Sequence, residues 1–160
     1  MKRTIFFTAA FLSFLGLMES RAQNMQNNRN MEKLKLTEEW DKTFPKSDKV
    51  DHSKVTFVNR FGITLAADLY VPKIAVADKF PAIAVSGPFG AVKEQSSGLY
   101  AQTLAERGFL TIAFDPSFTG ESSGQPRSVA SPDINTEDFS AAVDYLCLLY
   151  TSPSQRDSTR

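Results

Sequence analysis

The chain has 160 residues, 42% of them hydrophobic, and its 18 Lys and Arg balance its 18 Asp and Glu. This composition is typical of a globular domain and lacks the basic excess of a nucleic-acid-binding protein, so we expect no nucleic-acid partner. The single cysteine, Cys147, excludes an internal disulfide framework, and the single histidine, His52, argues against a histidine-rich metal site. We therefore expect no metal and no other cofactor.

The N-terminus has the zones of an export signal. Residues 1–3 are cationic at two of three positions, residues 4–18 form an apolar run, and Ser20 and Ala22 are small residues at the spacing that a signal peptidase recognises. This pattern predicts cleavage after Ala22, a periplasmic or secreted location, and no stable membrane span afterwards. An uncleaved membrane anchor is the alternative interpretation, although the apolar run is short for one.

Residues 23–53 are polar and rich in asparagine, which is typical of a mobile leader, with one short helix around Met31 to Trp40. His52 falls in the polar approach to the first strand, and we interpret it as a solvated surface histidine.

Two strand-like runs follow, Val55–Asn59 and Ile63–Val71. The short segment between them ends in Gly62, which can adopt the positive φ of a hairpin turn. In the second run the apolar residues Ile63, Leu65, Ala67 and Leu69 alternate with Thr64, Ala66, Asp68 and Tyr70. This alternation predicts a strand with one face on a core.

The next elements alternate between strand and helix. Ala82–Val85 and Phe109–Asp115 are apolar runs that predict strands buried on both faces. The helix between them is predicted to end at Gly108 and to carry Leu99, Thr103, Leu104 and Arg107 on one side.

A last helix is predicted over Asn135 to Leu146, within the segment "PDINTEDFSAAVDYL". Asn135 or Thr136 can cap it, and apolar residues recur at helical spacing at positions Phe139, Ala142, Val143 and Leu146. A strand, a crossover helix and a second strand imply a parallel pair with a right-handed connection. The fold class is therefore α/β, with an antiparallel hairpin at one edge and parallel strands joined by helices.

The loop after Asp115 contains "GESSG", a G-x-S-x-G pattern formed by Gly120, Ser122 and Gly124. A nucleophile elbow needs its serine directly between a buried strand and a helix, but four residues separate Asp115 from this pattern, and no helical period follows it. A serine nucleophile also needs a base, and no histidine follows Ser122. We therefore predict that Ser122 is not a nucleophile but belongs to a turn-forming loop that lines a pocket.

Residues 54–146 together resemble the N-terminal half of α/β-hydrolases, near dienelactone hydrolases and S9- and S15-type peptidase-like hydrolases. The segments that carry the resemblance are "VTFVNRFGITLAADLYVPK", "FPAIAVSGPFGAVKEQSSGLYAQTLAERGFLTIAFD", "GESSGQPR" and "EDFSAAVDYL". The resemblance implies an incomplete α/β-hydrolase fold, and it implies that the loop after Ser86 is the oxyanion loop.

Within that loop the resemblance makes the backbone N–H of Phe89, with that of Gly90, the candidate oxyanion-hole donors, and it makes Gly87, Pro88 and Ser122 candidates for lining the pocket. Relatives often carry His-Pro where this chain has Gly87-Pro88, which removes a side chain that shapes the loop.

The resemblance also implies that the nucleophile, a serine or cysteine, and its acid and histidine partners lie beyond this chain. No catalytic residue is then expected in the chain, which should be inactive as given. The parent protein would be a hydrolase of small-molecule substrates with ester, thioester, lactone or peptide-like bonds. The alternative is a short exported α/β domain that binds a ligand without catalysis.

Residues 147–160 begin with "CLLYTS", which resembles a translated sequencing-library adapter. We interpret residues 147–160 as a non-native or disordered tail. A frameshifted C-terminus and a natural short paralogue remain the alternatives.

Overall fold

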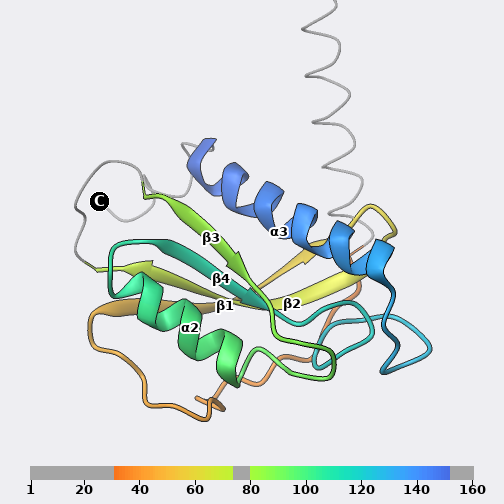
Figure 1. The fold of residues 1–160 in the computed structure, drawn as a ribbon, viewed down its shortest axis with the longest axis horizontal. Coiled ribbons are helices and arrows are strands. Elements are labelled where there is room, and N and C mark those ends of the chain that lie inside the picture. The colour runs from red at the N-terminus through yellow and green to blue at the C-terminus, as the bar shows by residue number, and fades with distance from the viewer. Residues whose placement is uncertain (1–30, 74–79, 152–160) are drawn as a thin grey trace, which may run out of the picture. The chain divides into compact units, whose positions relative to one another are not determined.

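The structure, a computed structural model, describes residues 31–73 and 80–151 (Figure 1). Residues from Glu32 onward form one compact unit. The predicted signal peptide and the cleavage site after Ala22 lie outside the described residues. The elements in chain order are β1 (Val50–Val58), β2 (Thr64–Pro72), β3 (Ala82–Val85), α2 (Ser96–Ala105), β4 (Leu110–Phe114) and α3 (Pro132–Thr151).

The four strands form one sheet in the order β1-β2-β4-β3. β1 and β2 form an antiparallel hairpin, β2 pairs antiparallel with β4, and β3 pairs parallel with β4. Gly62 has a φ of 77° in the hairpin turn, where Asn59 Oδ1 accepts hydrogen bonds from the backbone N–H groups of Phe61 and Ile63 at 3.0 Å. The predicted α/β class, the hairpin at one edge and the parallel pair joined by a helix are confirmed.

Two cores lie on opposite faces of the sheet. On one face α3 packs on the sheet through Ala141, Ala142 and Leu146, against strand residues that include Leu65, Leu69, Ile112 and Phe114. On the other face α2 contributes Ala101 and Ala105, which pack with Val50, Tyr70 and Ala113. Because side chains alternate along a strand, Leu69 and Tyr70 of β2 serve different cores.

The described residues correct the predicted leader. Residues 31–40 form no helix, and β1 begins at Val50, inside the leader. Phe44 is only 7% exposed because it packs against Gly98 of α2. The sequence did not predict that this segment packs on the domain, because it is mostly polar and its few buried residues follow no helical or strand period.

Strand burial also differs from the prediction. Every residue from Thr64 to Tyr70 is buried, so β2 is covered on both faces and not on one. β4 is fully buried as predicted, whereas β3 is partly exposed because it forms an edge of the sheet. The two alternating sets of side chains in β2 thus point into two different cores, and neither set faces solvent.

Helix boundaries and faces differ as well. α2 buries Ser97, Gly98, Ala101, Gln102 and Ala105, while Leu99 is 46% exposed, so the predicted side of Leu99 is the outer one. Small residues let α2 approach the sheet closely. Gly108, at a φ of 96°, follows the helix as expected.

α3 begins at Pro132, so Asn135 and Thr136 lie inside the helix and do not cap it. It continues to Thr151, so residues 147–151 are helical and the prediction of disorder is wrong for them; their non-native origin stays a prediction. Neither described helix has the length and apolar character that a membrane span requires.

Candidate active site

Two loops meet at the carboxyl ends of the parallel strands. The loop between β3 and α2 covers residues 86–95, and the loop between β4 and α3 covers residues 115–131. Because β3 and β4 are parallel neighbours, both loops leave the sheet at the same end of the strands. Open α/β sheets bind ligands at the carboxyl ends of their strands, so the candidate active site lies here.

The tip of the first loop is Gly87 to Gly90. The N–H of Ala91 donates to the carbonyl of Pro88 at 3.0 Å, Gly90 has a φ of 82°, and the Phe89 side chain is 70% exposed. Within residues 31–73 and 80–151, neither the N–H of Phe89 nor that of Gly90 has a hydrogen-bond acceptor. Both predicted donors are therefore available to a ligand, while their catalytic role stays a prediction.

Lys93 anchors the base of the same loop. Its fully buried ammonium lies 2.8 Å from Asp115 Oδ2, 2.7 Å from Glu121 Oε2 and 2.5 Å from Glu94 Oε1. Its backbone N–H donates to the other oxygen of Asp115 at 2.8 Å. Burial alone would lower the pKa of Lys93, but the neighbouring carboxylates outweigh it and raise that pKa, so the lysine is charged.

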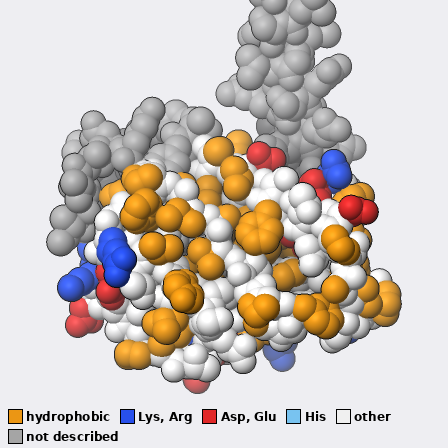
Figure 2. Space-filling view, viewed as in Figure 1, with side chains coloured by type: hydrophobic (Ala, Val, Ile, Leu, Met, Phe, Trp, Pro, Cys, Tyr) orange, Lys and Arg blue, Asp and Glu red, His pale blue; other side chains and the backbone are white. Residues whose placement is uncertain are grey.

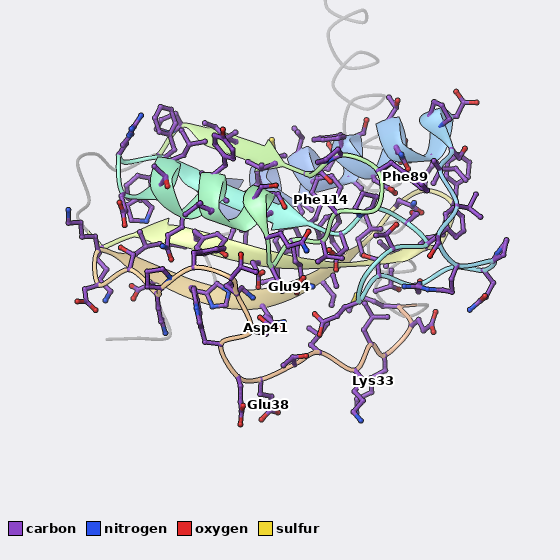
Figure 3. All side chains as sticks on the ribbon, turned by 60° about the horizontal axis from the view of Figure 1, so that its bottom comes forward. Lys33, Glu38, Asp41, Phe89, Glu94 and Phe114 are labelled. Carbon is purple, nitrogen blue, oxygen red and sulfur yellow. The ribbon has the colours of Figure 1, made fainter. Side chains whose placement is uncertain are left out.

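These pairs extend into a larger charge cluster towards the N-terminal segment. Lys54 Nζ lies 3.0 Å from Asp41 Oδ2 and 3.1 Å from Glu121 Oε2. Lys42 Nζ lies 2.7 Å from Asp41 Oδ1 and 2.9 Å from Asp68 Oδ2. In Figure 3 Asp41 and Glu94 lie close together, with Phe89 away from them towards α3. The charge cluster consists of Asp41, Lys42, His52, Lys54, Asp68, Lys93, Glu94, Asp115 and Glu121.

The carboxylates of the cluster for which a pKa shift is found are strongly acidic. Burial raises the pKa of Glu121, but the hydrogen bonds from Lys93, Thr37 and Lys54 outweigh it and lower that pKa to about 2. The pKa of Asp41 likewise falls to about 2, because Lys42 and Lys54 outweigh its burial. A general acid or base near neutral pH needs a pKa near the working pH. These two carboxylates are thus fixed charges that organise the loops.

His52 is not the solvated surface histidine that its surroundings in the sequence indicated. Its side chain is 13% exposed, and its Nε2 lies 2.8 Å from Asp68 Oδ1. The ring packs edge-on against Trp40, with centroids 5.1 Å apart, and lies tilted against Tyr70 at the same centroid distance. His52 stands directly opposite Tyr70 in the hairpin, so it faces the α2 side of the sheet.

Ser122 is buried, at 2% exposed. Its hydroxyl donates to the carbonyl of Asp115 at 2.7 Å and accepts from the N–H of Ala66 at 2.9 Å. Ser123 acts similarly, with its hydroxyl accepting from the N–H of Thr64 at 2.9 Å. These bonds tie the loop to β2 and account for both serines without catalysis; the predictions that Ser122 is not a nucleophile and that it lines a pocket stay predictions.

Gly120 fits the loop for a steric reason. A Cβ at this position would lie 2.2 Å from Asp115 Oδ2, and its φ is 53°. The N–H of the next residue, Glu121, donates to the same oxygen at 2.9 Å. Gly120 therefore lets the chain fold over the Asp115 carboxylate, a role that G-x-S-x-G spacing does not distinguish from an elbow.

Sequence reasoning missed the charge cluster. Of the partners of Lys93, Glu94 is its neighbour in the sequence, but Asp115 and Glu121 lie 22 and 28 residues away. Asp41 and Glu121 lie 13 and 67 residues from Lys54, so no local motif joins the cluster. One signal was present, since Asp115 directly follows a mostly apolar strand. In residues 31–73 and 80–151 no group of three or more His, Cys, Asp or Glu is arranged to hold a metal ion.

The candidate pocket residues Gly87 and Pro88 lie at the start of the tip. A Cβ on Gly87 would approach the Cβ of Ala91 to 2.8 Å, which explains glycine at the first of these positions. Their role in lining a pocket stays a prediction.

Comparison with known proteins gives close relatives. The chain is 67% identical over 143 residues to the uncharacterized protein PA2218 of Pseudomonas aeruginosa, covering 88% of this chain and 38% of that protein. It is 47% identical over 112 residues to the uncharacterized protein YcjY of Escherichia coli, covering 68% of this chain and 35% of YcjY. The chain thus spans little more than a third of the length of these relatives.

Solved structures agree with the fold. The crystal structure of PA2218 superposes with a TM-score of 0.71 at 75% identity, over 73% of this chain and 36% of that one. The α/β hydrolase GrgF from Penicillium sp. sh18 superposes with a TM-score of 0.53 at 26% identity, over 59% of this chain and 32% of GrgF.

The family model Peptidase_S15, described as X-Pro dipeptidyl-peptidase, matches residues 62–154, more than half of the chain. With the sheet order β1-β2-β4-β3 and the α/β-hydrolase neighbours, this match shows that the chain belongs to the X-Pro dipeptidyl-peptidase (S15) family and contains part of the N-terminal region of an α/β-hydrolase.

Proposed function

We propose that this chain is the N-terminal part of an exported hydrolase that cleaves ester, thioester, lactone or peptide-like bonds of small-molecule substrates. The observation that carries the proposal is the pair of unengaged N–H groups at Phe89 and Gly90, at the edge of the sheet where α/β folds bind ligands. The family match supports the same reaction class.

In this proposal the N–H of Phe89 donates to the oxyanion that forms when a nucleophile attacks the substrate carbonyl. A donor already in place needs no reorganisation as the charge develops, and one such donor changes kcat by roughly 10²–10³-fold. Gly90, at a φ of 82°, lets the chain turn directly after this donor.

The nucleophile, a serine or cysteine, and its acid and histidine partners are proposed to lie in the part of the fold that the relatives carry beyond the length spanned here. His52 is paired with Asp68, and the Ser122 hydroxyl is bonded to backbone on both sides. Neither residue is proposed as catalytic, and the chain as given is proposed to be inactive.

Export is proposed from the order of cationic, apolar and small residues in residues 1–22. We expect removal of residues 1–22 and a periplasmic or secreted product. Intact-mass measurement of protein recovered from the periplasm tests this, and a species that still carries Met1 would contradict it.

A chimera tests the catalytic proposal directly. Residues 23–146 of this chain are joined to the part of PA2218 that follows its equivalent helix, since the two proteins superpose well. The chimera is assayed with p-nitrophenyl esters, acyl thioesters, lactones and aminoacyl-proline p-nitroanilides, beside this chain alone as control. We expect turnover by the chimera only, and a folded chimera without turnover on any substrate would refute the proposal.

A second candidate is an exported ligand-binding domain without catalysis. Its supporting observation is that the single histidine of the chain, His52, lies on β1, which β2 and β4 separate from β3 and its loop, so no histidine base stands beside the Phe89–Gly90 tip. Binding of hydrolase substrates by this chain alone, together with an inactive chimera, would favour this alternative.

A further inference from the structure

The tip that carries Phe89 and Gly90 makes few contacts of its own. One backbone hydrogen bond, from Ala91 to Pro88, closes its turn, and Phe89 is 70% exposed. An oxyanion donor needs a fixed position, because a misplacement of about 1 Å is enough to weaken a catalytic site. The rigidity of the tip must therefore come from the residues at its base.

The base of the loop is bound to the end of β4 by two bonds from one residue. The backbone N–H and the ammonium of Lys93 contact the two oxygens of the Asp115 carboxylate, each at 2.8 Å. Both residues are fully buried. Two bonds to a planar carboxylate fix both the orientation of Lys93 and its distance from Asp115. The backbone three residues after Gly90 is therefore held in place relative to β4.

The other loop is locked to the same carboxylate. The N–H of Glu121 donates to Asp115 Oδ2 at 2.9 Å, and the Glu121 carboxylate accepts from Lys93 at 2.7 Å. Asp115 and Lys93 are therefore the shared anchor of both loops at the candidate active site.

The N-terminal segment closes this anchor from outside. We call residues 37–46 the strap. Its Thr37 donates through its N–H and hydroxyl to Glu121 Oε1 at 2.8 and 3.0 Å, and Thr43 donates to the carbonyl of Glu94 at 3.0 Å. The strap thus contacts both loops next to Lys93.

We infer that Lys93 and Asp115 are positioning residues that hold the β3–α2 loop to β4, with the strap over them, and so fix the Phe89–Gly90 peptide in place to bind an oxyanion. The inference rests on the proposed function for its catalytic meaning, while its structural claim about the tip stands by itself. Neither residue touches the substrate in this arrangement.

The chain contains a matched control for this inference. Lys42 is also a fully buried lysine and is paired with a fully buried aspartate, Asp68, at 2.9 Å. Asp68 lies within β2, however, and neither residue belongs to the two loops. Lys42 is part of the strap, but the strap contacts the two loops through Thr37 and Thr43. Loss of the Lys42 charge should therefore cost folding stability and release the tip far less than loss of the Lys93 charge.

The test measures chymotrypsin cleavage after Phe89 in the full 160-residue chain, relative to cleavage after Tyr100, which is 67% exposed but lies in α2. In Lys93→Met we expect this ratio to rise at least about tenfold, because a buried charge pair is lost at the base of the tip. Lys93→Arg should keep the ratio closer to that of the original chain, and Lys42→Met should raise it far less than Lys93→Met does.

An unchanged ratio in Lys93→Met, or an equal rise in Lys42→Met, would overturn the inference. If Lys93→Met does not fold, Glu121→Gln replaces it, because Glu121 is partly exposed and its loss should release the tip in the same direction.

The chimera supplies the catalytic readout. Lys93→Met should lower kcat about tenfold or more with KM nearly unchanged, because the oxyanion is bound only in the transition state. Lys42→Met should lower kcat much less than Lys93→Met does. Equal effects of the two substitutions on kcat would contradict positioning. An inactive unsubstituted chimera would refute the proposed function alone, and the cleavage ratio would still decide the inference.

Discussion

On the α3 face of the sheet the core is aromatic and aliphatic, whereas on the α2 face it combines alanines with buried charges. Phe57 stacks on Tyr145 at 5.3 Å, and Phe114 meets Phe139 edge-on at 5.0 Å. On the other face, Ala101, Ala105 and Ala113 form the apolar core, and Asp68 of β2, which points to the same face as Tyr70, pairs its buried carboxylate with Lys42. Apolar packing tolerates small rearrangements, but a buried charge without its partner is costly. The face that anchors the candidate site is therefore the less tolerant of the two.

The two edges of the sheet also differ in what they expose. Figure 2 shows many hydrophobic and few charged side chains on the side of the molecule that carries α2, β3 and α3. Exposed members include Phe139, Val143 and Leu148 of α3. β3 forms an edge of the sheet within the described residues. The opposite edge, β1, carries Asp51 and the cluster residue Lys54, and charges on an edge strand discourage pairing with another chain.

The largest expected effect comes from breaking one buried pair on the α2 face. Asp68→Ala leaves Lys42 buried without its carboxylate and His52 without its partner, and we expect it to lower the free energy of unfolding by about 3–5 kcal/mol. Urea unfolding followed by Trp40 fluorescence measures this, because Trp40 is the single tryptophan and packs against His52.

The double variant Lys42→Met/Asp68→Leu sharpens the comparison. Replacing both charges by apolar side chains should recover most of that loss, since a paired buried charge adds little net stability over a well-packed apolar pair. A loss below about 1 kcal/mol in Asp68→Ala would mean that the two faces do not differ in the way described.

A steric test on the same face follows in size. Gly120→Ala would place a Cβ 2.2 Å from Asp115 Oδ2 at a φ of 53°, and we expect a loss of about 2–4 kcal/mol. Gly62→Ala is the matched control, because Gly62 has a φ of 77° but open space around it, and about 1 kcal/mol is expected there. Equal losses in the two variants would show that the conformation matters at Gly120 and the carboxylate contact does not.

How far the sequence predicted this molecule depends on the face. Leu65, Leu69 and Leu146 belong to apolar patterns, and those patterns correctly predicted the strands, the hairpin, the helices and the α/β class. On the α2 face β2 presents Asp68 and Tyr70, which no hydrophobic pattern marks as buried. Their burial depends on partners from the strap, which becomes visible only when the chain is folded.

The sequence likewise predicted one part of the candidate site and missed another. The proposal of an oxyanion loop at Phe89 and Gly90 came from a family resemblance. The anchor formed by Lys93, Asp115 and Glu121 was not found, because its members are far apart in the sequence and each is a common surface residue type.

Acid should loosen the α2 face before the α3 face. In the folded chain the pKa values of Glu121 and Asp41 are about 2, below their ordinary 4.5 and 3.8. A lowered folded pKa gives stability that is fully present above the ordinary value and is lost as the pH falls towards the folded value. We therefore expect the free energy of unfolding to be level above about pH 5 and to fall between about pH 5 and pH 2.

Glu121→Gln provides the control for this pH dependence. It removes one of the two shifted carboxylates, so the decline below pH 5 should become shallower, as measured by urea unfolding at several pH values. The raised pKa of Lys93 acts only above its ordinary 10.5 and does not affect this window. A decline of the same steepness in Glu121→Gln would mean that carboxylates outside the cluster cause it.

The smallest effect on stability, and the clearest one on association, is expected at the exposed apolar surface of α3. Val143 is 49% exposed and lies outside the buried core, so Val143→Lys should change the free energy of unfolding by less than about 0.5 kcal/mol. Exposed apolar patches favour association, so the same substitution should lower self-association in sedimentation velocity experiments. Asp51→Asn on β1 changes the net charge by the same amount at a residue whose side chain is 72% exposed, and it should leave association unchanged. If Asp51→Asn reduced association as much as Val143→Lys, net charge and not the apolar surface of α3 would control it, and the contrast between the two edges of the sheet would fail.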